Sequence, residues 1–192
     1  MERGIYYFKR PGFKNTKQVL ELARERAQEL GIGRVVIASA SGKSAVQAVE
    51  AFKGAKIKLV AVTYHAGFSN PDEVELEEAN RKVLERHRIP ILMASHALSG
   101  VERSVTKKFG GCGPVEAMAA ALRGLFGEGL KTCVEVSVMA ADAGLVPTSE
   151  EVITIGGTGG LGVDTACVIL PANMNRFFDL QVREIICIPR VH

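Results

Sequence analysis

The segment from Val35 to Ala45 constrains the fold more than any other part of the chain. It begins with the apolar run Val-Val-Ile-Ala, which is typical of a buried parallel strand, and continues through a turn of small, hydroxyl-bearing residues into a helical pattern. The first N–H groups of such a helix point outward and carry about +0.5 charge. With serine hydroxyls and a lysine beside them, they match a phosphate group. A serine-capped helix with a solvated lysine is the structural alternative. The predicted phosphate-binding residues here are Ser39, Ser41, Gly42, Lys43 and Ser44.

Helix and strand patterns alternate along the first half of the chain. The apolar stripe of residues 16–30 predicts a helix that Asn15 or Thr16 caps and that Gly31 ends. The other predicted elements are strands at residues 34–39, 57–63 and 90–94, a helix at 44–52, and a helix that ends near Arg88. Strands separated by single helices imply right-handed crossovers and a parallel sheet.

The second half has a different order. Residues 95–145 favour helices and turns only: a short helix before residue 110, then helices at 115–126 and 132–143. Strands resume at residues 151–155, 164–170 and 182–188. The loop between the first two of these is too short to hold a crossover helix, so we expect them to be antiparallel neighbours. We therefore predict one α/β domain over residues 1–192, with three layers (α/β/α) and a mostly parallel sheet that has an antiparallel edge.

A second loop, rich in glycine, joins those two strands. It contains Gly156, Gly157, Thr158, Gly159, Gly160, Leu161 and Gly162. Glycines permit positive φ angles and let another molecule approach the backbone closely, which makes this loop a second candidate for ligand binding. A mobile hairpin tip is the alternative interpretation.

Neither glycine segment fits a familiar phosphate motif. The sequence Gly42-Lys43-Ser44 resembles the end of a Walker A loop, but that motif needs glycine where Ile37 stands. The spacing of the glycines at 157, 159 and 162 fits a dinucleotide fingerprint, yet a strand pattern follows at residues 166–170 where the fingerprint needs a helix.

The run from Thr16 through Ser39-Ala40-Ser41-Gly42-Lys43-Ser44-Ala45 resembles the opening of the C-terminal domain of pyruvate kinase. Residues 151–165, Glu-Val-Ile-Thr-Ile-Gly-Gly-Thr-Gly-Gly-Leu-Gly-Val-Asp-Thr, resemble that domain's last strand, loop and strand. The similarity covers residues 16–170, apart from an unmatched helical insertion at about 95–130. In that family the two loops face each other at the sheet edge and hold the phosphates of an allosteric sugar bisphosphate.

The departures from that family change the expected ligand. The catalytic barrel of pyruvate kinase alone needs about 250 residues, so we expect no pyruvate kinase activity from a chain of 192 residues. The glycine-rich loop also lacks the arginine and tryptophan that the kinase uses for its second phosphate. The chain looks more like free-standing archaeal-type relatives of the domain, and that resemblance implies a bound flavin mononucleotide (FMN). Its phosphate would lie on the serine-rich turn and its ring in a glycine-lined slot.

Ligands of open α/β sheets bind beyond the carboxyl ends of the parallel strands. That rule nominates residues 39–44, 63–67 and 95–103. His65 and His96 each follow a strand and can act as general acid or base, or can cap the strand and face water. Tyr64 can stack on a planar ring or serve in packing. Thr63, Ser99, Glu102 and Arg103 complete the residues that we expect near the ligand.

Three further features carry weaker functional hypotheses. Cys112, flanked by glycines at a predicted helix N-terminus, has the setting of a reactive thiol, or else lies in a tight turn that needs a small residue. Glu135 and Asp142 share one helix face and can do acid–base work or form a solvated stripe. Lys107 and Lys108 are interpreted as solvated charges.

Composition excludes several classes of function. The net charge is only +3 and the basic residues are dispersed, which argues against a nucleic-acid partner. No apolar run approaches the roughly 18 residues that cross a membrane, and the N-terminus lacks a signal peptide, so we expect a cytoplasmic protein. The four cysteines lack the spacing of a zinc site, so no metal is expected.

The strand pattern near residues 183–188 is apolar and unprotected. Either a second subunit, which would make a homo-oligomer, or the N-terminal segment around Tyr6-Tyr7-Phe8 would pair with it.

Three hypotheses about function remain. We favour a protein that binds FMN or another phosphorylated small molecule between the two loops. The alternatives are an enzyme that acts on a small phosphorylated metabolite through His65 or His96, and a regulatory module that signals ligand binding to a partner.

Overall fold

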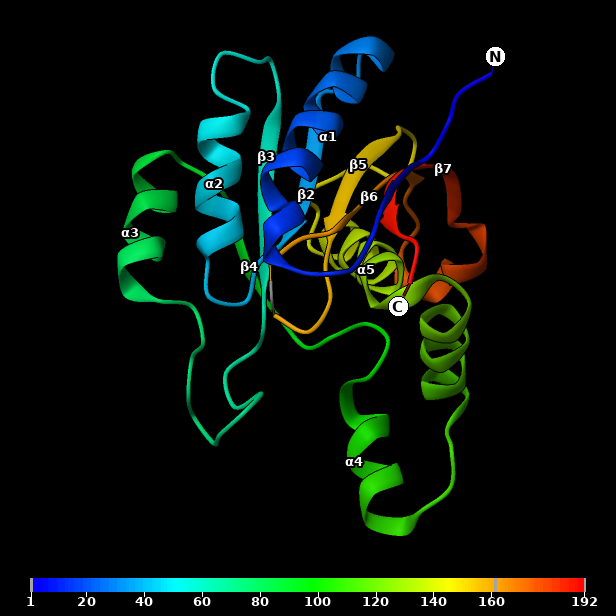
Figure 1. The fold of residues 1–192 in the computed structure, drawn as a ribbon. Coiled ribbons are helices and arrows are strands. Elements are labelled where there is room, and N and C mark those ends of the chain that lie inside the picture. The colour runs from blue at the N-terminus through cyan, green and yellow to red at the C-terminus, as the bar shows by residue number, and fades with distance from the viewer. Residues whose placement is uncertain (1, 161, 192) are drawn as a thin grey trace.

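The structure, a computed structural model, describes residues 2–160 and 162–191. The described residues form one sheet of seven strands in the order β1-β7-β6-β5-β2-β3-β4. Helices cover both faces of this sheet, and α4 projects away from the body of the molecule (Figure 1). The strands are β1 (Tyr6–Phe8), β2 (Arg34–Ala38), β3 (Lys58–Thr63), β4 (Ile91–Met93), β5 (Val152–Gly156), β6 (Thr165–Leu170) and β7 (Gln181–Pro189).

The helices lie close to their predicted positions. They are α1 (Thr16–Leu30), α2 (Lys43–Ala51), α3 (Glu78–Arg86), α4 (Gly100–Phe109) and α5 (Pro114–Asp142), with short 3₁₀ turns η1 (Phe13–Asn15) and η2 (Met174–Asp179). Gly31 ends α1 in the left-handed conformation, as predicted, with φ of 68°. The two helices expected over residues 115–143 are the two parts of α5, which are separated by a break at Gly127, where φ is 84° and ψ is 166°.

The start of α1 differs from the prediction of a side-chain cap. Asn15 precedes the helix, but its side-chain amide donates to the carbonyl oxygen of Arg10. The Thr16 hydroxyl instead contacts the backbone of Val163, far along the chain. A tertiary contact has therefore taken the polar group that the local pattern assigned to capping.

The mostly parallel α/β sheet is confirmed. β2 pairs in parallel with both β3 and β5, and β3 pairs in parallel with β4. β6 runs antiparallel to β5, as the short loop between them predicts, and also antiparallel to β7. Antiparallel pairing is thus confined to the part of the sheet around β6, and β2 and β5 end side by side at the same edge.

The strand near residues 183–188 is covered by the N-terminal segment. β1 pairs in parallel with β7, with Tyr6 opposite Cys187 and Phe8 opposite Pro189. Of the two expected partners for this strand, the structure has the N-terminal one. Because β1 already pairs with β7, the exposed strand that suggested a second subunit is covered within the chain.

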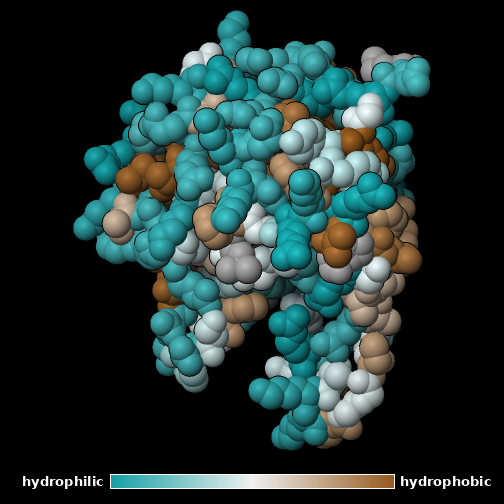
Figure 2. Space-filling view, in the orientation of Figure 1, coloured by the Kyte–Doolittle hydropathy of each residue, from teal (hydrophilic) through white to brown (hydrophobic). Residues whose placement is uncertain are grey.

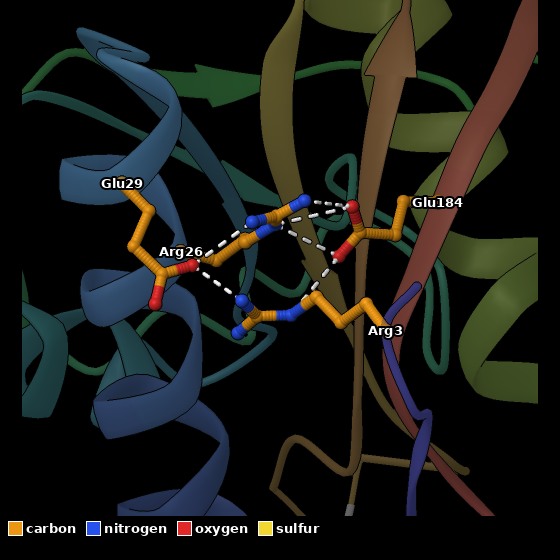
Figure 3. Close-up of polar contacts among 4 residues, drawn as sticks. All are labelled: Arg3, Arg26, Glu29 and Glu184. Carbon is orange, nitrogen blue, oxygen red and sulfur yellow. Dashed lines mark hydrogen bonds and ion pairs between the residues drawn. The ribbon is translucent and has the colours of Figure 1, made fainter. Parts of the chain in front are cut away.

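A cluster of ion pairs ties the N-terminal segment to α1 and β7 (Figure 3). The guanidinium of Arg26 has a 6% exposed side chain and donates to the carboxylate of Glu184, with Nη2 2.6 Å from Oε2. It also pairs with Glu29, and Arg3 reaches both carboxylates. The hydrogen bond to Glu184 raises the pKa of Arg26, and the hydrogen bond from Arg26 lowers the pKa of Glu29.

The two faces of the sheet bury different residues of the same strands. Val35, Ile37, Ile153 and Ile155 face α1 and α2 in one core cluster. Val36 and its neighbours on β3 and β5 face α5 in another. Because both faces are covered, the strands have continuous apolar sequences. Each fully buried side chain, such as that of Ile37, contributes about 1.5–3 kcal/mol of burial free energy.

Candidate functional site

A cavity of about 760 Å³ lies where the carboxyl ends of the parallel strands meet α5. Its size falls within the range of about 300–1,000 Å³ that is usual for small-molecule sites. It lies at the edge that the rule for open α/β sheets nominates. Figure 2 shows that the molecule is hollowed on this side between two projecting parts, which are the segment between β3 and α3 and the region of α4.

The serine turn (residues 39–44) forms one wall and leads into α2. Ser39 and Ser44 are each 8% exposed. The Ser39 hydroxyl oxygen accepts a hydrogen bond of 3.2 Å from the N–H of Ala45, so Ser39 supplies the contact that a capping residue would normally make. Lys43 and Ser44 occupy the first turn, whose N–H groups have no partner within the helix. The turn therefore presents hydroxyl and N–H donors to the cavity.

The back of the serine turn is held by the start of α3. The carbonyl oxygen of Ser41 accepts hydrogen bonds from the Glu77 N–H at 3.2 Å and from the Asn80 side chain at 2.9 Å. Gly42 has φ of 89°, and a Cβ on it would lie 2.7 Å from atoms of Asn80 and Leu76. Gly42 therefore serves the turn through its backbone shape and close packing. The sequence interpretation missed Glu77 and Asn80, because nothing local ties them to the turn.

Lys43 is already paired at the rim of the cavity. Its Nζ lies 2.6 Å from a carboxylate oxygen of Glu77, and its side chain is 67% exposed. Surface pairs of this kind contribute about 0–1 kcal/mol, so the lysine can exchange this partner for a ligand at little cost.

The glycine loop (residues 156–162) forms a neighbouring wall, because β5 lies directly beside β2. Leu161 of this loop lies outside the described residues. A Cβ on Gly157 would lie 2.0 Å from the carbonyl oxygen of Gly162, and one on Gly162 would meet Phe13 and Thr16. A Cβ on Gly156 would likewise lie 2.3 Å from the carbonyl oxygen of Gly129. By contrast, among the described residues no atom beyond the chain neighbours would lie within 4 Å of a Cβ on Gly159 or Gly160. Three glycines are thus required by close packing, while Gly159 and Gly160 leave the backbone open to a ligand.

Asp164, at the end of the glycine loop, is fully buried and anchors that loop. Its carboxylate accepts hydrogen bonds from the Gly12 N–H at 3.2 Å and from the Thr165 hydroxyl at 3.0 Å. Burial raises the pKa of Asp164, and hydrogen bonds from Thr158 and its other partners oppose that shift. The loop is therefore fastened to the N-terminal segment through one buried carboxyl group.

The α5 wall of the cavity carries a buried ion pair. Lys131 and Glu135, both with 4% exposed side chains, lie 2.7 Å apart through Nζ and Oε2, and Glu128 lies 3.7 Å from Nζ. The other oxygen of Glu135 accepts a 2.9 Å hydrogen bond from the Leu98 N–H. The spacing of residues 128, 131 and 135 on an otherwise apolar helix is the signal that could have found this group.

The pairing of Glu135 with Asp142 is wrong. Asp142 is exposed and accepts hydrogen bonds from the Asn173 side chain and the Met174 N–H at the start of η2. Glu135 is buried beside Lys131. The spacing of the two residues puts them on one face of α5. Tertiary packing nevertheless buries Glu135 beside Lys131 and leaves Asp142 exposed beside η2, so the two carboxylates do not act as a pair.

Aromatic rings gather at another side of the cavity. Tyr64 stacks on Phe68 with centroids 4.0 Å apart, and the His96 ring lies 5.0 Å from Tyr64 and 5.1 Å from Phe68. Burial lowers the pKa of His96 and raises that of Tyr64. His65 lies 6.2 Å from His96, and its Nδ1 contacts the carbonyl oxygen of Ala66 at 2.7 Å.

Many of the residues nominated from the sequence line this one cavity. They are Ser39, Ser41, Lys43, Ser44, Thr63, Tyr64, His96, Arg103, Gly157, Thr158, Gly159, Gly160 and Gly162. Among the described lining residues, Gly42, His65, Ser99 and Gly156 are absent. Gly42 and Gly156 pack behind the loops. Ser99 is buried next to the start of α4.

Other candidates lie elsewhere. Cys112 is exposed between α4 and α5, with its Sγ 3.6 Å from the carbonyl oxygen of Gly113. Glu102 accepts a hydrogen bond from the Glu116 N–H in the first turn of α5, and Lys107 and Lys108 are exposed, as predicted. Cys133, Cys167 and Cys187 are buried, and burial raises the pKa of Cys187 to about 12. Within residues 2–160 and 162–191, no group of three or more His, Cys, Asp and Glu side chains is arranged to hold a metal ion.

The comparison with known families agrees with this geometry. The sequence matches the family described as pyruvate kinase, alpha/beta domain, over residues 17–169. That match spans the serine turn, the cavity wall on α5 and the glycine loop. In the part of the chain that the structure describes, no helix is both long and apolar enough to cross a membrane. The chain belongs to the pyruvate kinase alpha/beta domain family.

Proposed function

We propose that the protein binds a phosphorylated small molecule with a planar ring, and that FMN is this ligand. The observation that carries the proposal is that the serine turn and the glycine loop line one cavity. Helix N-termini and adjacent backbone N–H groups favour phosphate. The hydroxyls of Ser41 and Ser44 stand beside the N-terminus of α2, so this wall is the place for the phosphate.

The charge of the cavity supports an anionic ligand. Lys43, Arg103, Arg123 and Lys131 line it, against the carboxylates of Glu128 and Glu135 and that of Glu77, which pairs with Lys43 at the rim, so one positive charge is in excess. Excess positive charge in a cleft with low-dielectric walls concentrates anions there. A sugar bisphosphate would need a second strong phosphate site, and the described glycine loop offers backbone groups and Thr158 without a basic side chain.

The remaining walls suit a flat ring. Tyr64 and Phe68 contribute aromatic surface, Val136 and Met139 contribute aliphatic surface, and Gly159 and Gly160 allow close approach of a ring to the backbone. When bound, FMN would supply redox chemistry, while the chain would bind the phosphate, orient the ring and exclude water.

The test is a comparison of FMN, riboflavin and inorganic phosphate in thermal shift and equilibrium binding assays. FMN should stabilise the protein more than riboflavin does. The Ser41→Ala/Ser44→Ala variant should bind FMN at least about tenfold more weakly, whereas Ser104→Ala, a substitution of an exposed serine on α4, should not change the affinity. Equal effects of FMN and riboflavin, or an unchanged affinity in the double variant, would show that the phosphate site is wrong. An absorbance spectrum and mass spectrometry of the compound released from the purified protein test the flavin itself.

A second candidate function is an enzyme that acts on a small phosphorylated metabolite. The observation that favours it is His96, which lines the cavity and is half-buried. Because burial lowers the pKa of His96, the ring is neutral at neutral pH and can accept a proton. Turnover of any phosphorylated metabolite that the protein converts should fall about 100-fold in His96→Asn and stay constant in His65→Asn. Unchanged turnover in His96→Asn would remove this candidate.

A further inference from the structure

The α5 wall of the cavity contains a buried ammonium group with donors to spare. Lys131 is 3% exposed and lines the cavity. A lysine ammonium has several N–H donors and no acceptor. Among the described residues, one carboxylate oxygen, that of Glu135 at 2.7 Å, lies within hydrogen-bond distance of its Nζ, and the Glu128 oxygen at 3.7 Å is beyond it. A buried donor without an acceptor costs about 1–3 kcal/mol, so this group favours an acceptor in the cavity.

The acceptors on the same wall are already used. Both oxygens of Glu135 are engaged, one by Lys131 and the other by the Leu98 N–H. Glu128 is paired with Arg123 as well as with Lys131. Both carboxylates on this wall thus already have partners, while the ammonium of Lys131 keeps N–H donors that no other described residue accepts.

Arg103 brings a second cation to this end of the cavity from α4. It lines the cavity, and no ion pair joins it to a carboxylate within the described residues. Arg123, in contrast, is held by Glu128. Arg103, Lys131 and His96 line the same cavity, Arg103 from α4, Lys131 from α5 and His96 from the segment after β4.

We propose that Arg103, Lys131 and His96 form a second subsite, which takes the carboxylates of a small organic dianion while the serine turn holds the phosphorylated ligand at the other wall. The planar fork of an arginine matches a carboxylate in bidentate geometry, and the buried lysine provides a point charge for the other end. The subsite goes beyond the proposed function, since it requires the cavity and not the identity of the phosphorylated ligand.

Malonate is the probe, with malonamide as its uncharged analogue, and isothermal titration calorimetry at low ionic strength is the measurement. The wild-type protein should bind malonate and not malonamide. Arg103→Ala should weaken malonate binding at least about tenfold, equivalent to about 1.4 kcal/mol, and this loss should exceed its effect on phosphate binding. Lys107→Ala, on the exposed part of the same helix, is the matched control and should bind malonate as the wild type does.

A substitution of Lys131 alone would leave Glu135 charged and buried, so the second variant changes both residues. Lys131→Met/Glu135→Gln removes the charges and keeps an acceptor for the Leu98 N–H. It should retain the circular dichroism spectrum of the wild type and lose malonate affinity by a similar factor. If it folds and binds malonate normally, the subsite is wrong.

Two further outcomes decide the proposal. Malonate should still bind when the protein is saturated with inorganic phosphate or FMN. Competition between malonate and phosphate, or no malonate binding at all, would overturn the second subsite. If malonate binds as expected and FMN does not bind at all, the proposed function fails and the subsite stands.

Discussion

The serine turn and the glycine loop line the same cavity but are built in different ways. The serine turn is shaped by hydrogen bonds, from the Ala45 N–H to the Ser39 hydroxyl oxygen and from the start of α3 to the Ser41 carbonyl oxygen. The glycine loop is shaped by backbone contact, since Gly157 and Gly162 lie closer to their neighbours than any side chain would allow. Apart from the closely packed Gly42, the serine turn can be changed one polar side chain at a time, whereas the glycine loop depends on the absence of side chains at residues 157 and 162.

This difference predicts where the molecule is most sensitive. Gly157→Ala should have the largest effect, a loss of about 3 kcal/mol in the free energy of unfolding, because its Cβ would meet the Gly162 carbonyl oxygen at 2.0 Å. Gly160→Ala is the matched control. With φ of 74° and open space around it, that substitution should cost about 1 kcal/mol. Urea denaturation measures both, and equal losses would contradict the difference in packing between Gly157 and Gly160.

Thr16→Val tests the hydrogen bonds that fasten the glycine loop to α1. The Thr16 hydroxyl oxygen accepts from the Val163 N–H at 3.2 Å, and the residue is buried. Valine keeps the shape and leaves that N–H without its partner, so we expect a loss of about 1–2 kcal/mol. Thr148→Val, at an exposed position, should change the free energy of unfolding by less than about 0.5 kcal/mol. Similar values for the two variants would mean that Thr16 does not anchor the loop.

In the serine turn, stability and ligand binding should separate between two serines. Ser39→Ala removes the acceptor for the Ala45 N–H and should cost about 1 kcal/mol of stability. Ser41 holds the turn through its carbonyl oxygen, so Ser41→Ala should leave stability within about 0.5 kcal/mol and weaken phosphate binding. Thermal unfolding and phosphate titration of both variants check this, and a larger stability loss in Ser41→Ala would reverse the assignment.

The smallest expected effect is a pH dependence that belongs to the glycine loop. Burial raises the pKa of Asp164 above 3.8. Between pH 3.8 and the higher pKa of the folded state, the folded protein binds more protons than the unfolded chain. The stabilising contribution of Asp164 is therefore fully present below pH 3.8 and is lost as the pH rises through its folded pKa. The stability of the wild type relative to Asp164→Asn should therefore fall as the pH rises above about 4. The difference between wild type and Ser39→Ala should stay constant over this range. If the stability of the wild type relative to Asp164→Asn rose with pH instead, the pKa of Asp164 would be lowered in the folded protein.

Much of the fold follows from local pattern. The helix over residues 16–30 has the predicted bounds because its apolar stripe and Gly31 are local signals. The antiparallel pairing of β5 with β6 follows from the length of one loop. The position of both loops at one edge follows from the parallel pairing of β2 with β5.

The parts that sequence reasoning missed depend on which surfaces meet. Glu135 and Asp142 are equivalent by spacing, and tertiary packing alone makes one a buried partner of Lys131 and the other an exposed acceptor near η2. Lys43 looks like a free cation until the start of α3 brings Glu77 beside it. Thr16 has the residue type of a helix cap, and the return of the chain at Val163 gives it another partner.

The register of β2 with β5 has a consequence for how the molecule is made. Ile37 pairs with Ile155, so the serine turn and the glycine loop come together only after a very long stretch of chain has closed on itself. Closure of this kind costs entropy before any contact offsets it, and such contacts slow folding. During synthesis, a growing chain that has produced the serine turn but not the glycine loop would carry half of a ligand site. Affinity for the ligand should therefore appear late in refolding, together with the last strands.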